Sequence, residues 1–226
     1  VDRRQGLDQL RPPAHAPEFS RGFAARTCMM AGVGLTGVFL WYLVRFWVYG
    51  KAVVLTSAPL TIPAGFLIAG MAVATLIGAA LASWAAGPFS ERIEEKNIPV
   101  ARVVAGACLL YAAGLALAWG LGVWSTGTAR ENGMLLFALI SGFAFGVYDS
   151  LGLELVMDSL PDPRRAGHDL GIYALANSAG LALAAIIGAL LVNAFEHSFG
   201  YYLLFPSAIV MVLLAGIVTL TTKSAE

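Results

Sequence analysis

Apolar residues gather in six long runs along this chain, and charged residues, prolines and polar clusters separate the runs. Each run is about 20 residues long or longer, which is what an α-helix needs to cross a hydrocarbon core about 30 Å thick. The pattern therefore predicts an all-α integral membrane protein with six transmembrane helices. The six predicted spans are Thr27–Tyr49, Pro63–Ala86, Val100–Val123, Gly133–Met157, Leu170–Phe195 and Tyr201–Thr221.

The stretches between the spans are too short to hold an extramembrane domain. We therefore expect one six-helix transmembrane domain over residues 27–222, with a cytoplasmic tail or linker at 1–26 and a short cytoplasmic tail at 223–226. The first tail could end in a surface helix at Glu18–Arg26. Its first 25 residues hold no apolar core, so we expect no signal peptide there. Because the chain begins with Val1, either its start codon is GTG or further residues precede it.

Lysine and arginine are distributed unevenly between the two ends of the predicted spans, and such residues accumulate on cytoplasmic flanks. Eleven lie on one side and three on the other. This bias predicts that both termini are cytoplasmic, as an even number of spans requires. The larger group is Arg3, Arg4, Arg11, Arg21, Arg26, Arg92, Lys96, Arg102, Arg164, Arg165 and Lys223, and the smaller is Arg45, Lys51 and Arg130. Arg45 lies close enough to the outer end of its span to act as an interfacial anchor.

Composition supports a membrane protein and argues against several other classes. The chain is 58% hydrophobic and 12% charged, whereas a soluble domain carries about 25% charged residues. The formal charge is zero without a dense basic cluster, which argues against nucleic-acid binding. We also expect no cofactor, no metal site and no enzymatic activity, because no nucleophile motif is present and the three histidines lie outside the spans and far apart.

Small residues are distributed unevenly among the spans. From Pro63 to Gly87, 15 of 25 residues are Gly, Ala, Ser or Thr, whereas from Tyr201 to Thr221 only 6 of 21 are. Small residues let membrane helices approach closely. The second span is therefore expected to be buried against other helices, and the sixth to face lipid. Gly142 and Gly146 on the fourth span have the G-x-x-x-G spacing, which at most marks a helix contact.

The fourth span carries the polar residues that best fit a functional site, because ionisable side chains inside a membrane are costly. Asp149 lies eight residues from Met157, roughly 12 Å deep, whereas Glu154 is shallower. They point about 140° apart on the helix, so they do not form a carboxylate pair. Asp149 could exchange a proton or bind a cationic or polyhydroxyl solute, or it could serve packing alone. Asn177 on the fifth span lies at a similar depth, where it could neighbour Asp149 or make an interhelical hydrogen bond.

The stretch between the second and third spans is similar to the G-x-L-x-D-R-x-G-R-R loop of the major facilitator superfamily (MFS). Gly87 and Arg92 match that loop, Glu91 replaces its aspartate, and Lys96 keeps one basic position. In the family this loop helps to set the conformational equilibrium. The resemblance implies that role for Gly87, Glu91 and Arg92, although a solvated charged turn would also explain them.

A second resemblance covers the fourth and fifth spans and their connection. Gly146-Val-Tyr148 and the L-P-D-P turn from Leu160, with the D-L-G stretch from Asp169 to Asn177, resemble the corresponding region of actinobacterial-type members of the family. The residues of the implied cytoplasmic turn are Asp158, Arg164, Arg165 and Asp169.

The resemblance implies the C-terminal six-helix half of an MFS transporter, built from two inverted three-helix repeats. Its first and fourth helices would line the substrate cavity, its second and fifth would contact the other half, and its third and sixth would be peripheral. We expect half of a proton-coupled secondary transporter for a small solute in the cytoplasmic membrane. The other half would be upstream sequence, a partner chain or a second copy. The alternative is a non-transporting membrane subunit that docks a larger membrane complex.

Overall fold

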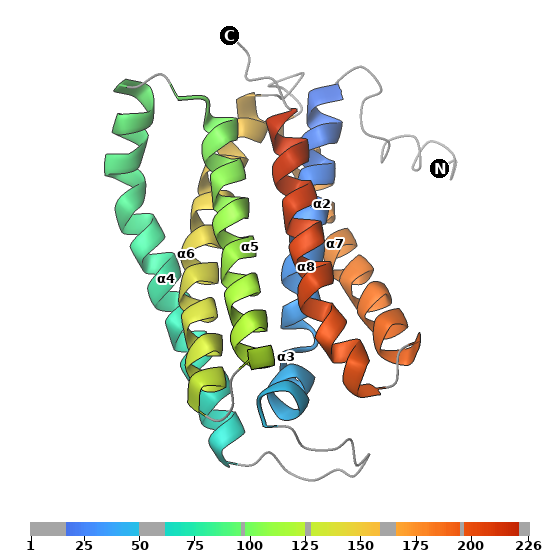
Figure 1. The fold of residues 1–226 in the computed structure, drawn as a ribbon. Coiled ribbons are helices and arrows are strands. Elements are labelled where there is room, and N and C mark those ends of the chain that lie inside the picture. The colour runs from blue at the N-terminus through green and yellow to red at the C-terminus, as the bar shows by residue number, and fades with distance from the viewer. Residues whose placement is uncertain are drawn as a thin grey trace, which may run out of the picture.

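The computed structural model describes residues 17–49, 62–95, 98–124, 128–158, 166–194 and 197–221. Its regular elements in this part of the chain are all helical, and they begin and end as follows (Figure 1). They are α2 (Pro17–Gly37), α3 (Leu40–Tyr42), the π-helix η1 (Leu43–Val48), α4 (Ile62–Glu95), α5 (Val100–Trp124), α6 (Thr128–Asp158), α7 (Ala166–Ala194) and α8 (His197–Leu220).

Six helices of the described chain are long and apolar enough to cross a membrane, which confirms the predicted number of spans. They run over Glu18–Val48, Ala64–Ala86, Val100–Trp124, Thr128–Leu153, Leu170–Ala194 and Gly200–Leu220. The last five lie close to their predicted positions. The first begins nine residues earlier than predicted.

Residues 18–26, which were expected to form a surface helix, instead belong to the first membrane helix. Pro17 opens α2, a position where proline is favoured because the missing N–H would have no helical partner. Phe19 is fully buried and packs with Ile172 and Tyr173 of α7. This contact holds the start of α2 in the bundle. The helix therefore continues without a break through Arg26 to Gly37, a length of about 31 Å at 1.5 Å per residue.

The helices form two sets of three that meet along α5 and α8. In one set α6 packs against α4 and α5, and in the other α2 packs against α7 and α8 (Figure 1). Helices α2, α4 and α5 correspond to α6, α7 and α8, in that order. The contact of α6 with α4 then corresponds to that of α2 with α7, and the contact of α6 with α5 corresponds to that of α2 with α8. Since each repeat has three spans, the second repeat crosses in the opposite direction to the first. The fold thus fits two inverted three-helix repeats.

Glycines permit the closest approaches within each set. A Cβ on Gly142 of α6 would overlap the Thr75 carbonyl oxygen of α4, and one on Gly146 would lie 2.8 Å from the Ala82 Cβ. In the other set, a Cβ on Gly180 of α7 would lie 2.7 Å from the Thr27 carbonyl oxygen. The G-x-x-x-G pair is therefore a helix contact between α4 and α6, as expected.

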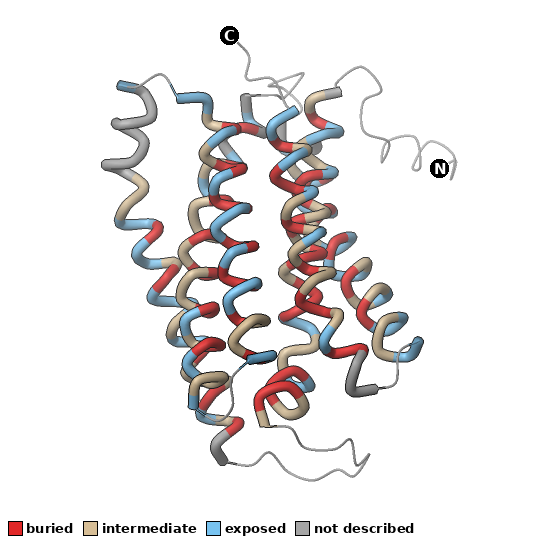
Figure 2. The backbone as a smooth tube through the Cα atoms, viewed as in Figure 1, coloured by how far each residue is buried: buried red, intermediate tan, exposed pale blue. Residues whose placement is uncertain are grey.

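The prediction that the second span is buried is wrong for this six-helix unit. Only 22% of the α4 span is buried, the same share as in α7, compared with 50% in α5 and 39% in α8 (Figure 2). One reason is that several of the small residues of α4 lie on an outer stripe rather than against α6. The outer stripe of α4 consists of Gly65, Ala69, Ala72, Ser83 and Ala86, each exposed or half-buried.

Helix α7 carries a matching outer stripe of small residues. It consists of Gly171, Ala174, Ser178, Ala182, Ala185 and Ala189, each exposed or half-buried. At about 100° per residue, Asn177 lies between this outer stripe and the face that packs on α2. Large apolar residues occupy the remaining exposed side, with Phe66, Val73 and Trp84 on α4 and Ile186 and Leu190 on α7. Helices at equivalent positions in the two repeats therefore expose the same two kinds of surface.

Candidate functional site

Arg26 of α2 connects the two polar residues that the sequence singled out on α6 and α7. Its Nη1 lies 2.6 Å from Oδ1 of Asp149. Its Nε donates a hydrogen bond to Oδ1 of Asn177, at 2.7 Å. Arg26 lies eight residues after Glu18, where the first candidate span begins, and Asp149 lies four residues before Leu153, where the fourth ends, so the pair lies inside both spans towards the end at which α2 begins. These three side chains form the Arg26 site.

Three aromatic rings surround the guanidinium group of Arg26. Its Cζ lies 5.7 Å from the ring centroids of both Phe145 and Tyr148 on α6, and 6.0 Å from that of Tyr173 on α7. A cation within about 6 Å of a ring face is attracted by the ring quadrupole, and the attraction is stronger away from water. Tyr148 and Tyr173 are almost fully buried. The rings therefore hold the guanidinium group at one position between the helices.

The two charges of the Arg26 site differ in how far the helices bury them. The side chain of Arg26 is 10% exposed, whereas that of Asp149 is 53% exposed. A buried ion pair that loses one partner leaves an uncompensated charge, which costs several kcal/mol when the remaining charge is deeply buried. Losing Asp149 would therefore cost more than losing Arg26, because the half-exposed carboxylate is less enclosed by the helices than the guanidinium group.

The Arg26 site also joins the two repeats at their equivalent first helices. Helices α2 and α6 make little other contact with each other, because each packs mainly on the two other helices of its own set. The ion pair between Arg26 and Asp149 therefore crosses the boundary between the repeats. A change in the spacing of α2 and α6 would lengthen or break it.

The structure brings together some predicted site residues and not others. Asp149 and Asn177 meet through Arg26 rather than directly. Glu154 and Asp158 belong to α6 and Asp169 to α7, but their side chains lie outside the described residues, as do Arg164 and Arg165 altogether. Gly87, Glu91 and Arg92 were expected in a connection, yet the backbone of α4 remains helical to Glu95. Their side chains are not among those described.

Arg26 was not predicted as a site residue, because an arginine just before an apolar run was assigned to the cytoplasmic flank. A signal was present in the residues just before it. Phe19, Phe23 and Ala25 continue the apolar pattern of the first span towards the N-terminus, and Phe19 and Ala25 are buried. A single internal charge made the first apolar run appear to begin at Thr27.

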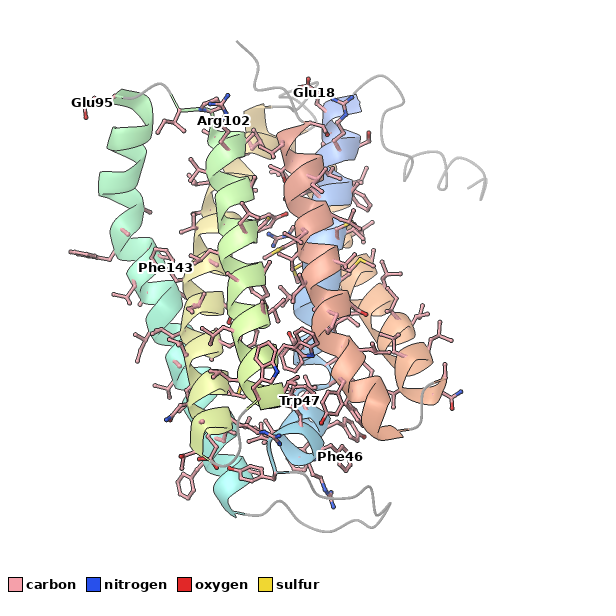
Figure 3. All side chains as sticks on the ribbon, in the orientation of Figure 1. Glu18, Phe46, Trp47, Glu95, Arg102 and Phe143 are labelled. Carbon is pink, nitrogen blue, oxygen red and sulfur yellow. The ribbon has the colours of Figure 1, made fainter. Side chains whose placement is uncertain are left out.

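Aromatic side chains, among them Phe46 and Trp47, gather at the end of the bundle opposite Glu18 (Figure 3). There Trp47 of η1 lies 4.1 Å from Tyr202 and 5.5 Å from Phe205 between ring centroids, and it is 3% exposed. Nη1 of Arg130 donates a hydrogen bond to the Trp47 carbonyl oxygen at 3.0 Å, which satisfies a group near the end of a helix. Burial, and then a hydrogen bond with Glu131, raise the pKa of Tyr49 to about 12.

No group of three or more His, Cys, Asp or Glu side chains that could hold a metal ion occurs among the described residues. Cys28 and Cys108 are both free thiols. The polar groups that meet at the Arg26 site are one guanidinium, one carboxylate and one amide group.

Comparison with known proteins adds one finding. The model of the Major Facilitator Superfamily matches residues 63–226, which is well over half of the chain and includes α4 to α8. Helix α2, with Arg26, precedes the matched residues. No curated protein and no solved structure matches the chain. From the extent of the family match, together with six membrane-spanning helices arranged as paired sets of three, the chain belongs to the Major Facilitator Superfamily.

Proposed function

We propose that this chain forms one half of a secondary active transporter that moves a small solute across the cytoplasmic membrane. The observation that carries the proposal is the ion pair between Arg26 and Asp149, which lies within two of the candidate membrane spans. Charged side chains at such depth are expensive and are found where a solute or ion passes. The pair joins the first helix of each repeat, and the half-exposed Asp149 leaves the site open on one side.

The outer stripes of α4 and α7 support a second six-helix half as the partner. Small residues on an exposed helix face allow another helix to approach closely, whereas the large apolar residues beside them suit lipid. A Cβ added at Gly65 or Gly171 would meet nothing within 4 Å, so both positions have room for a partner. The second half would be upstream sequence, a partner chain or a second copy. It would cover these stripes and enclose the path of the solute beside Asp149.

Charge distribution supports cytoplasmic termini. Arg21, near the start of α2, donates from Nη1 to the Thr221 carbonyl oxygen just after α8, so both ends of the bundle lie on the same side. Arg45 and Arg130 lie at the other end of their helices. Moving Arg26 from the cytoplasmic group into the membrane leaves a bias of ten against three, which still favours this orientation.

Asp149 is also the group that we propose couples transport to protons. Protonation of Asp149 would remove its attraction for Arg26 and loosen the link between α2 and α6. A proton could thus change the spacing of the repeats as access to the site alternates.

The test is transport by the chain together with its second half in proteoliposomes that contain a pH-sensitive dye. We expect some members of a panel of small solutes to move protons with them. Asp149→Asn should lower this flux about tenfold or more, since it removes a charge-assisted contact. Ser150→Ala, at the exposed neighbouring position on α6, is the matched control and should retain the flux. A complete transporter that moved no solute would refute the proposal.

A second candidate is a non-transporting subunit that uses the same outer stripes to dock a larger membrane complex. The acidic Glu94 and Glu95, which stand where the family loop has glycine and arginine, favour it. The Asp149→Asn variant separates the two functions. A docking subunit would keep its complex and its activity unchanged, whereas a transporter would assemble normally and lose transport.

A further inference from the structure

The Arg26 site has a buried cation and a half-exposed anion, and this difference bears on which solute it can accept. We infer that the solute is an organic anion with a carboxylate group, which takes the place of Asp149 on Arg26. The inference rests on the proposed transport function and names the solute class for the same site. Asp149 considered alone suggested a cationic or polyhydroxyl solute. Arg26 reverses the charge that the solute should carry.

Exchange of one carboxylate for another keeps Arg26 neutralised throughout. The side chain of Asp149 is 53% exposed, so it can leave Arg26 and become hydrated at low cost. Arg26, at 10% exposed, cannot be hydrated in the same way, so its guanidinium group is more stable with an anionic partner than without one. An incoming carboxylate supplies that partner.

A cationic solute meets the opposite situation. If it drew Asp149 away, it would leave the guanidinium group buried and unpaired, and the remaining charge would be costly. If it bound Asp149 without breaking the pair, it would lie within a few ångströms of Arg26 and be repelled in a medium of low dielectric constant. Both routes disfavour cations at this site.

In the described part of the chain, the guanidinium group of Arg26 has N–H donors that neither Asp149 nor Asn177 uses. Arginine presents five N–H donors in a planar fork that matches the two oxygens of a carboxylate. Asp149 contacts Nη1 through Oδ1, and Asn177 accepts from Nε. Among the described residues these are the polar contacts of the group, and Nη2 contributes to neither. A carboxylate that bound Nη1 and Nη2 together would gain a bidentate contact that Asp149 does not make.

The aromatic residues indicate the rest of the solute. Tyr148 and Tyr173 are 2% and 8% exposed and are occupied by packing around Arg26. Phe145 is half-buried, so part of its ring remains accessible beside the guanidinium group. A carboxylate with a small apolar body can therefore bind Arg26 and lay that body against Phe145.

The experiment measures binding by the purified full chain in detergent through its thermal unfolding midpoint. The probes are benzoate, benzamide and benzylamine, which share a ring and carry a negative, zero or positive charge. Ionic strength is held constant with sodium chloride. We expect benzoate to raise the midpoint in a saturable way and the other two to leave it unchanged. Ser150→Ala should behave like the unmodified chain.

Two variants distinguish binding at Arg26 from general stabilisation. Arg26→Gln should abolish the benzoate effect. Asp149→Asn should have a lower starting midpoint, because Arg26 loses its partner, and should bind benzoate about tenfold more tightly, because the competing carboxylate is gone. If Asp149→Asn does not fold, benzoate added during purification should restore the folded protein, whereas benzamide should not.

Several outcomes would overturn the inference. Stabilisation by benzylamine instead of benzoate would show a cation site, and a benzoate effect that survives Arg26→Gln would show an adventitious additive only. No benzoate effect in the unmodified chain and in Asp149→Asn would also reject the carboxylate. None of these results touches the proposed transport function, which fails separately if the complete transporter moves no solute of any charge.

Discussion

The first membrane span contains two buried nitrogen-bearing side chains that are stabilised in different ways. Arg26, in the regular helix α2, has its guanidinium group paired with Asp149 and Asn177 on two other helices. Trp47, in the π-helix η1, is packed against Tyr202 and Phe205, and its Nε1 has no hydrogen-bond partner among the described residues. Polar partners hold one residue, and apolar contact area holds the other.

If the proposed solute binds at Arg26, this difference separates a part of the span that would respond to the solute from a part, around Trp47, that stabilises the fold. A carboxylate that is paired with a guanidinium group can be exchanged for another carboxylate at modest cost, as the binding and release of a solute require. Packing around an indole ring has no such alternative partner, because close-packed interiors do not deform continuously. We therefore expect changes near Arg26 to alter binding and changes near Trp47 to alter stability alone.

The largest expected effect comes from removing Asp149, the more exposed member of the ion pair with Arg26. Asp149→Ala leaves Arg26 buried without an anionic partner and should lower the free energy of unfolding by about 3 kcal/mol, at the lower end of values for buried pairs. Arg26→Met should cost less, because the remaining Asp149 can be hydrated and methionine fills part of the space. SDS-induced unfolding in mixed micelles, followed by circular dichroism, measures both. An equal or reversed order would contradict the assigned difference in burial.

The helices of this chain were predictable from its sequence, whereas the Arg26 site was not. Helix number and helix type follow from hydropathy, because an uninterrupted apolar run in lipid must satisfy its backbone hydrogen bonds internally. The regular packing of Gly142 on α4 could likewise be anticipated from spacing. These features depend on local composition, which each run carries within itself.

The Arg26 site could not be predicted in the same way, because it depends on contacts between residues 123 and 151 positions apart in the chain. An arginine at the edge of an apolar run is usually a cytoplasmic flank. Only the packing of Phe19 on α7 places this one inside. Burial of α4 failed for a related reason, since small residues show that a helix face is suited to packing but do not identify the partner.

A smaller effect on stability is expected from overpacking the space around Trp47. A Cβ at Gly122 of α5 would overlap the indole ring of the buried Trp47, so Gly122→Ala should destabilise the bundle by about 1–3 kcal/mol. The matched control is Gly106→Ala on the same helix, where a Cβ would meet nothing within 4 Å. That change should be neutral or stabilising, since alanine is the better helix former. Thermal midpoints compare the two variants.

A double variant tests whether Trp47 is the cause. Trp47→Phe in the Gly122→Ala background should recover part of the lost stability, because the smaller ring leaves space for the new methyl group. Benzoate binding should be unchanged in all of these variants. If Gly122→Ala lost benzoate binding with the fold intact, packing around Trp47 and binding at the Arg26 site would be coupled.

The smallest effect is expected at Arg45, the second arginine of the first span. Its Cζ lies 5.9 Å from the ring centroid of Phe46, a contact near the end of the bundle where water competes. Arg45→Gln should therefore change the free energy of unfolding by no more than about 0.5 kcal/mol, as for most surface substitutions. Arg26→Gln, the same chemical change in the same span, should abolish benzoate binding, whereas Arg45→Gln should preserve it. If both variants lost binding equally, position within the span would not be what distinguishes the two arginines.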